Sequence, residues 1–145
     1  SEINQAHPDV RAVISVNKGL VTQASAAIPV VPLYFAILYK VMKRAGNHEN
    51  CIQQIARLFT QKLYTPEGFR ADENGFIRMD DYELLPEIQE EVKKCWKAVT
   101  TDTVNQYCDI DGYWEDFYHM FGFHYSDIDY TQDVDANVEI NGIVM

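Results

Sequence analysis

The first patterned segment of the chain is a short apolar run that ends at Asn17. Its alternate positions are apolar: Val10, Ala12, Ile14 and Val16. Val13 makes the opposite face apolar as well. A short β-branched run that is apolar on both sides is typical of a strand buried on both faces, as in the parallel sheets of α/β proteins. The sequence Asn17-Lys18-Gly19 at its end predicts a turn.

Two helical patterns follow this turn. The first begins near Pro29 and Pro32, which suit a first helical turn, and it ends at Gly46. Its apolar residues recur at helical spacing: Val31, Phe35, Leu38 and Met42. A second helix is predicted from about residue 49 to residue 63, and one apolar stripe marks its expected buried side. That stripe consists of Ile52, Ile55, Ala56, Phe59 and Leu63.

The second half of the chain predicts two more helices and one weak strand. Pro86 begins a helix with glutamates in its first turns and lysines near its end, as the helix dipole favours. A last helix is predicted over residues 112–121, with Asp111 as its N-cap and Gly122 as its stop. Its aromatic residues are expected in the core: Tyr113, Trp114, Phe117, Tyr118 and Phe121. Residues 76–79 predict a short strand, and the residues after His124 an acidic loop.

The predicted strand at the start of the chain lacks clear neighbours. A strand buried on both faces normally pairs along both edges, yet the remaining sequence predicts mostly helix and loop. We therefore expect the missing strands to precede Ser1 or to belong to another chain. The expected fold class is an α/β fragment, in which the terminal strand of a parallel sheet is followed by a mostly helical C-terminal region.

The net charge narrows the range of functions. The 145 residues include 22 Asp and Glu but only 12 Lys and Arg, a formal net charge of −10. A nucleic-acid binder needs a basic face, and an anionic membrane surface would repel this chain. We therefore expect neither a nucleic acid nor a membrane as a partner. The longest apolar run, residues 24–38, contains two prolines and is too short for a membrane span.

The cysteines favour a reducing compartment, and the spacing of the histidines does not predict a metal site. Cys51, Cys95 and Cys108 form neither a CxxC pair nor a disulfide framework, which fits a reducing compartment. The first residues also lack the basic and apolar regions of a signal peptide, so we expect a cytoplasmic protein. The four histidines have no metal-ligand spacing, alone or with the cysteines, and no metal is expected.

Candidate binding groups gather in the turn after the first strand. Ligands of open α/β sheets bind at the carboxyl ends of strands. The backbone amides of Leu20 and Val21 and the hydroxyl of Thr22 are candidates to bind a polar ligand group, and the small residues at 24–27 leave room for it. The alternative is that Thr22 or Ser25 merely caps the following helix. Taken alone, the pattern slightly favours the cap, which is the commoner role.

Two tyrosine–lysine pairs resemble a catalytic dyad only in spacing. Tyr34 and Lys43 are nine residues apart, which places them on opposite faces of a helix. Tyr39 and Lys43 share a face, but Lys43 lies in the last turn, where a lysine commonly satisfies the helix dipole. We therefore assign no catalytic residue to this chain.

Several motifs in colinear order resemble one known family. The first is Val16-Asn-Lys-Gly-Leu-Val-Thr-Gln-Ala-Ser25, and others lie at 28–34, 39–43, 46–54, 77–84, 99–101, 112–113, 121–123 and 128–130. Together they resemble the NADH-dependent trans-2-enoyl-CoA reductases, a family that includes the FabV type of enoyl-acyl-carrier-protein reductase. The resemblance covers nearly the whole chain, and it implies the C-terminal part of a protein more than twice as long.

The resemblance implies a function, a cofactor and a set of site residues. The longer protein would use NADH to reduce the C2–C3 double bond of trans-2-enoyl thioesters, carried on CoA or acyl-carrier protein, in fatty acid metabolism. Its core would be Rossmann-like, of the short-chain-dehydrogenase type. Leu20, Val21 and Thr22 would bind the nicotinamide carboxamide, and Ser25 and Tyr34 would contact the substrate. The glycine-rich turn and the catalytic Tyr-x8-Lys of the family precede the matched region, so we expect the isolated chain to be inactive.

The same resemblance suggests a division of the chain and its partners. Residues 1–46 would form the end of the Rossmann-like core, with the cofactor loop and a helix that covers the substrate. Residues 47–145 would form a helical C-terminal region. The expected partners are an enoyl thioester and either the missing N-terminal part or a second copy. The alternative is a small acidic interaction module that pairs its unpartnered strand with the sheet of another protein.

Overall fold

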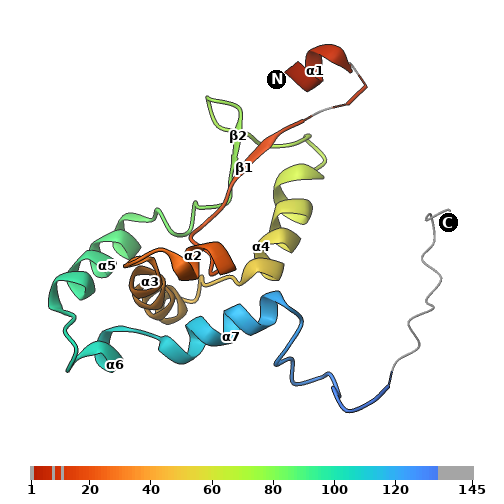
Figure 1. Cartoon of the computed structure of the whole chain (residues 1–145). Coiled ribbons are helices and arrows are strands. Elements are labelled where there is room, and N and C mark those ends of the chain that lie inside the picture. The colour runs from red at the N-terminus through yellow and green to blue at the C-terminus, as the bar shows by residue number, and fades with distance from the viewer. Residues whose placement is uncertain (1, 8, 11, 134–145) are drawn as a thin grey trace.

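The centre of the fold is one apolar helix, α3, which spans Val31–Ala45. The structure is a computed structural model and describes residues 2–7, 9–10 and 12–133. The helices α5, over Pro86–Ala98, and α7, over Ile110–Met120, pack along α3 (Figure 1). Four α3 side chains are fully buried at these contacts: Ile37, Leu38, Tyr39 and Met42. This helix therefore joins the first third of the chain to its second half.

The boundaries of the two longest helices confirm the sequence predictions. Pro32 lies in the first turn of α3, and Gly46 follows its end with φ of 75°, a left-handed conformation that glycine adopts readily. The helix α5 begins at Pro86, and its buried side consists of Ile88, Val92 and Cys95. Local signals were sufficient for both helices, because each cap lies within one turn of the helix that it ends.

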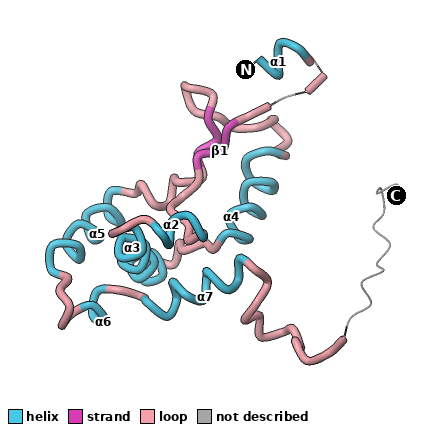
Figure 2. Tube along the Cα trace, viewed as in Figure 1, coloured by secondary structure: helices cyan, strands magenta, loops and turns pink. Residues whose placement is uncertain are grey.

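The first strand is shorter and more exposed than its sequence predicts. The strand β1 covers only Ile14–Val16, and it pairs in parallel with β2, over Phe76–Arg78, so that Ser15 lies opposite Ile77. Ile14 is 61% exposed, so the prediction of burial on both faces is wrong within this chain. The expectation that the chain contains no neighbour is wrong for one edge of the strand, where β2 pairs with it, and strands outside this chain stay a prediction for the other edge. The outer face of β1 stays open because no further layer of the described residues covers it. The prediction of an α/β fragment is confirmed in its general form, since the described residues form a two-stranded parallel sheet and helices (Figure 2).

The second predicted helix forms, but its orientation contradicts the prediction. It consists of α4, over Cys51–Arg57, and a π-helical continuation, η1, over Leu58–Leu63. Four residues of the apolar stripe are exposed: Ala56, Ile52 by 54%, Ile55 by 46% and Phe59 by 44%. The buried residues of α4 are instead Gln54 and Arg57. The polar side faces inward because Arg57 binds carboxylates of the neighbouring segments.

Three short helices are not predicted by any helical period in the sequence. These are α1 over Glu2–Ala6, α2 over Gln23–Ala27 and α6 over Val104–Tyr107, each too short for a helical period to appear. The N-cap of α7 is Asp109, two residues before the predicted Asp111, and its side chain accepts a hydrogen bond from the amide of Gly112. Of its aromatic residues only Tyr113 is buried, and Trp114 is 50% exposed, against the prediction of a core position.

The C-terminal segment follows α7 as turns up to residue 133, as predicted for an acidic loop. Residues 134–145 of that loop lie outside the described residues. Among the helices of the described ranges, none has the length and apolar character needed to cross a bilayer.

Candidate cofactor and substrate site

The loop between β1 and α2 is tied to the rest of the fold through its backbone. The amide of Gly19 donates to Oε2 of Glu83 at 2.6 Å, and the amide of Val21 donates to the Tyr39 hydroxyl at 2.9 Å. The carbonyl of Leu20 accepts a hydrogen bond from Oγ of Ser25 at 3.3 Å. The Val21 amide is therefore used within the fold and is not available to a ligand, so the prediction for this amide is wrong. Three successive residues are held in place at the carboxyl end of β1.

Thr22 and Ser25 form a reciprocal cap at the start of α2. The Ser25 amide donates to Thr22 Oγ1 at 3.1 Å, and the Thr22 amide donates to Ser25 Oγ at 2.7 Å. The capping alternative is therefore confirmed as a structural role. In this cap the Thr22 hydroxyl serves only as an acceptor. The O–H of the same hydroxyl points to Ser25 Oγ at 3.2 Å, which is long for an O–H···O hydrogen bond. Because a hydroxyl has one donor and two acceptor positions, this O–H can turn to a ligand without breaking the cap.

Glu83 connects this loop to α3. Its carboxylate, 9% exposed as a residue, accepts from the Gly19 amide through Oε2 and from the Tyr34 hydroxyl through Oε1, each at 2.6 Å. Burial and the hydrogen bond to Glu83 raise the pKa of Tyr34 to about 12, so that its hydroxyl stays protonated and donates at neutral pH. No local pattern in the sequence distinguishes Glu83 from the other acidic residues, so its position in the site follows from the structure alone.

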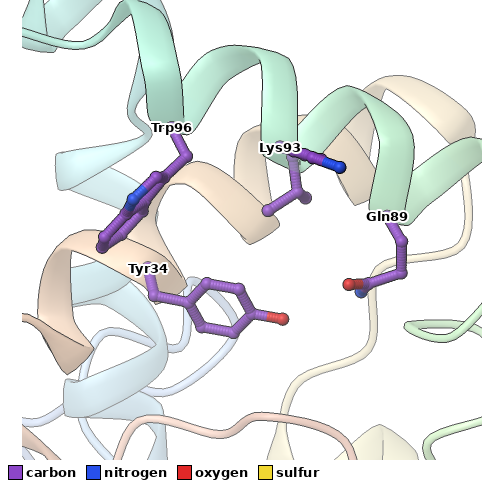
Figure 3. Close-up of a pocket in the computed structure, with 5 residues that line it drawn as sticks. Tyr34, Gln89, Lys93 and Trp96 are labelled. Atoms are coloured by element: carbon purple, nitrogen blue, oxygen red, sulfur yellow. The ribbon is translucent and has the colours of Figure 1, made fainter.

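A small, mostly apolar pocket of about 250 Å³ lies between α3 and α5 beside Tyr34. Its lining residues are Tyr34, Gln89, Val92, Lys93 and Trp96. Figure 3 shows Tyr34 facing the α5 side chains, with Trp96 at one end of the pocket and Gln89 at the other. The ring of Tyr34 thus forms a pocket wall while its hydroxyl is bonded to Glu83. Ser25, the other predicted substrate residue, instead uses its hydroxyl in the loop.

The tyrosine–lysine pairs are directed to separate partners. The Tyr39 hydroxyl is fully buried and accepts from Val21, and burial raises its pKa above the usual value for tyrosine. The Lys43 ammonium forms an ion pair with Asp109 at 2.7 Å. Neither arrangement resembles a dyad in which a lysine lowers the pKa of a catalytic tyrosine.

Lys18 is buried beneath the loop, although its sequence context predicts only a turn. It is 2% exposed, and its ammonium lies 4.7 Å from the centre of the Tyr39 ring and donates to the Gly19 carbonyl at 3.3 Å. Burial lowers the pKa of Lys18 to about 8, and the carboxylates of Asp116 and Glu83 oppose this shift. An ammonium buried among aromatic and backbone groups makes folding dependent on pH.

We expect Lys18→Met in the full-length protein that carries this chain to change the pH dependence of stability. The unfolded lysine has a pKa of 10.5 and the folded one about 8, so the unfolded state binds more protons between these values. The free energy of unfolding of the wild type should therefore rise relative to Lys18→Met from pH 7 to pH 10, by about 2–3 kcal/mol. Urea unfolding at both pH values measures this, with the exposed Lys97→Met as control. Parallel pH profiles of wild type and Lys18→Met would contradict it.

Two family models match the chain in order. The model described as trans-2-enoyl-CoA reductase catalytic region matches residues 1–64, which include the loop and α3. The model described as enoyl reductase FAD binding domain matches residues 71–134, which include Glu83 and α5. The hydrogen bonds of Glu83 therefore connect the two matched regions.

Curated relatives match almost the whole chain. The enoyl-acyl-carrier-protein reductase (NADH) of Cytophaga hutchinsonii is 50% identical over 134 residues, which cover 92% of this chain and 34% of that protein. The protein of the same name from Flavobacterium psychrophilum is 46% identical over 134 residues, with the same two shares. The chain thus spans about a third of the length of the curated relatives it matches.

Solved structures of similar sequence share this fold. The trans-2-enoyl-CoA reductase of Clostridium acetobutulicum in complex with NAD matches with a TM-score of 0.79 and 46% identity, covering 92% of this chain and 35% of that one. The trans-2-enoyl-CoA reductase of Treponema denticola in complex with NAD gives a TM-score of 0.80 at 46% identity, covering 92% and 34%.

The loop fits part of a nicotinamide cofactor. A carboxamide has both a donor and an acceptor, and the Thr22 hydroxyl of the loop offers its O–H as a donor and the acceptor position that the cap leaves unused. These groups lie at the carboxyl end of a parallel strand, where nucleotides bind in α/β folds.

A flavin dinucleotide does not fit the described residues of the second matched region. A pyrophosphate needs free amides at a helix start or basic side chains. The helix α5 begins with Pro86, which has no N–H, and Glu87 follows in its first turn. At the start of α7 the Gly112 amide already donates to Asp109. Acidic residues also far outnumber basic ones between residues 71 and 133, so we assign no FAD to this region.

Proposed function

This chain belongs to the enoyl reductase family, and we propose that it forms the C-terminal third of a longer protein that reduces trans-2-enoyl thioesters with NADH. The observation that carries the proposal is the tethered loop at the carboxyl end of β1, which offers a donor and an acceptor for a carboxamide. The likeness to reductases in complex with NAD over 92% of the chain supports it.

In this proposal each site residue has a stated task. NADH supplies the hydride for C3 of the enoyl group. Leu20 and Thr22 hold its carboxamide, so that one face of the nicotinamide meets the substrate. Tyr34 and Ser25 border the acyl thioester, and the pocket beside Tyr34 offers apolar walls for it. Residues 1–46 thus provide the cofactor loop and the covering helix, and residues 47–145 the helical region that supports them.

The rest of the protein would supply the Rossmann-like sheet, the glycine-rich turn and the catalytic Tyr-x8-Lys. Two apolar surfaces of this chain support the presence of a covering partner: the outer face of β1 at Ile14, and the stripe of α4 at Ile52 and Ile55. Such exposed apolar surfaces typically mark an interface. The cysteines at 51, 95 and 108 are free, which supports a cytoplasmic location.

The function is tested on the full-length protein with a short trans-2-enoyl-CoA as substrate. The absorbance of NADH should fall only when the thioester is present, and the product should be the saturated acyl-CoA. A protein that neither binds NADH nor reduces the thioester would contradict the proposal. It would instead favour the interaction module, whose test is capture of a defined partner through the outer edge of β1.

Thr22→Val in the full-length protein separates the cofactor role of this residue from its cap. Loss of one hydrogen bond to the carboxamide should lower kcat/KM for NADH by roughly threefold to tenfold. Loss of the cap should also lower the free energy of unfolding by about 1 kcal/mol. Thr22→Ser keeps both bonds and should be milder in both respects.

A matched control is Thr103→Val, which removes the hydroxyl that accepts from the Thr100 amide at 2.9 Å. It should lower stability to a similar extent with normal NADH kinetics. If Thr22→Val behaves in the same way as this control, Thr22 is a helix cap only.

A further inference from the structure

We infer that Glu83 is a positioning residue, whose carboxylate fixes the proposed cofactor loop and the substrate-facing Tyr34 in one geometry. The inference rests on the proposed function. It adds a residue from the second matched region to a site that otherwise lies wholly in the first.

The two hydrogen bonds of Glu83 bridge distant parts of the chain. Gly19 lies 64 residues before it and Tyr34 lies 49 residues before it, and each donates to a different oxygen at 2.6 Å. Short bonds to an ionised acceptor are among the stronger hydrogen bonds in proteins. Because Glu83 is nearly buried, water competes little for either oxygen.

A carboxylate is the side chain that this arrangement requires. Both partners are donors, and an ionised carboxylate accepts through both of its oxygens, whereas an amide accepts through only one. The side-chain amide of Gln89 donates to the Glu83 carbonyl at 2.8 Å, so that α5 holds the backbone that carries the carboxylate. Lys18 faces Glu83 and partly balances its charge.

The close approach of the loop to α3 depends on Gly19, whose amide binds Glu83. A Cβ on Gly19 would lie 2.6 Å from a ring carbon of Phe35 and 3.4 Å from the Glu83 carboxylate. Only glycine therefore lets the backbone amide reach Glu83 while the loop lies on α3. Loss of the bond from Gly19 to Glu83 would leave the loop held only by the hydrogen bonds of Val21 to Tyr39 and of Ser25 to Leu20, so that the start of the loop would shift relative to the proposed ligand.

One carboxylate thus supports two parts of the proposed site. Its Oε2 positions the loop that would hold the carboxamide. Its Oε1 positions the ring of Tyr34, which forms a wall of the pocket. A change at Glu83 should therefore affect the binding of both NADH and the thioester, whereas a change at Tyr34 should affect mainly the thioester.

The test uses four variants of the full-length protein: Glu83→Ala, Glu83→Gln, Tyr34→Phe and, as control, Glu87→Ala at an exposed acidic position on α5. NADH affinity is measured by equilibrium titration without thioester, and KM, kcat and the melting temperature are measured in parallel. Glu83→Ala should weaken NADH binding by about tenfold or more, since a buried amide loses a charged acceptor. Glu83→Gln, which keeps one acceptor, should weaken it by about threefold.

Tyr34→Phe separates the effects of the two hydrogen bonds of Glu83. It removes the hydroxyl at Oε1 and leaves the bond to Gly19, so NADH affinity should change less than twofold while KM for the thioester rises. Hydrogen exchange of the amides of residues 19–22 should be faster in Glu83→Ala but not in Tyr34→Phe or Glu87→Ala.

The outcome that overturns the inference is a lower melting temperature of Glu83→Ala or Glu83→Gln with unchanged NADH affinity and unchanged KM values. If Glu83→Ala does not fold, Glu83→Gln decides by the same comparison. A wild-type protein that does not bind NADH would overturn the proposed function itself, and this is seen before any variant is made.

Discussion

Purified alone, this 145-residue chain is expected to show no NADH-dependent reduction of a short trans-2-enoyl-CoA, while the full-length protein turns over. The sequence contains no Gly-x-Gly-x-x-Gly turn for the pyrophosphate of NADH. Its tyrosine–lysine pairs are not arranged for catalysis, because the Tyr39 hydroxyl is bonded to Val21 and the Lys43 ammonium to Asp109. The expected loss of rate is complete, down to the background oxidation of NADH.

The measurement compares the absorbance of NADH over time for the isolated chain and the full-length protein. Lys43→Met in the full-length protein is the control, and it should keep the rate of the wild type. Co-expression of the chain with the preceding part of the protein, as two polypeptides, should restore some turnover if the exposed faces of β1 and α4 bind that part. Steady turnover by the isolated chain would contradict the prediction and make Tyr39 and Lys43 catalytic candidates.

Arg57→Ala is expected to destabilise the full-length protein by about 3 kcal/mol, because it leaves the largely buried Glu49 carboxylate without its cation and the Met79 carbonyl without its donor, while Asp81 keeps its ion pair with Lys62. The guanidinium is 6% exposed and donates to Glu49 at 2.7 Å, to Asp81 at 2.9 Å and to the Met79 carbonyl at 3.0 Å. It also lies 4.1 Å from the centre of the Tyr82 ring. One side chain thus joins α4 to the segment that follows β2.

Urea unfolding measures this loss, and Arg70→Ala is the matched control. Arg70 also forms an ion pair, with Glu67 at 3.3 Å, but its side chain is 68% exposed. An exposed pair contributes less than about 1 kcal/mol, so the control should stay close to the wild type. Equal effects of the two substitutions would show that the Arg57 network is no more than a surface ion pair.

Where the sequence predictions held, the deciding residues are neighbours in the chain. Pro32 and Gly46 bound α3 within one turn of its ends, and Pro86 begins α5. The cap of α7 shows how such a rule can be misapplied. A capping side chain accepts from an amide two or three residues later, so the Gly112 amide required Asp109 rather than Asp111.

Where the predictions failed, the deciding contact joins distant residues. The amphipathic pattern of α4 is real, but a pattern does not state which side faces the rest of this chain. That side was decided by Arg57, whose partners include Asp81, 24 residues away. In the same way, the pairing of β1 with β2 connects residues 14–16 with residues 76–78, and no turn between them fixes the register.

The sequence by itself determined the long helices, the loop of candidate binding residues and the family resemblance, because each depends on residue types at short and fixed spacing. Only the tertiary structure decided how the loop is held. Glu83 is one of 22 acidic residues, and its neighbours do not distinguish it. Its role appears only when α3 and α5 pack and bring Gly19 and Tyr34 to its two oxygens. Backbone preferences act between neighbours, whereas a bridge across 64 residues exists only after the helices have packed.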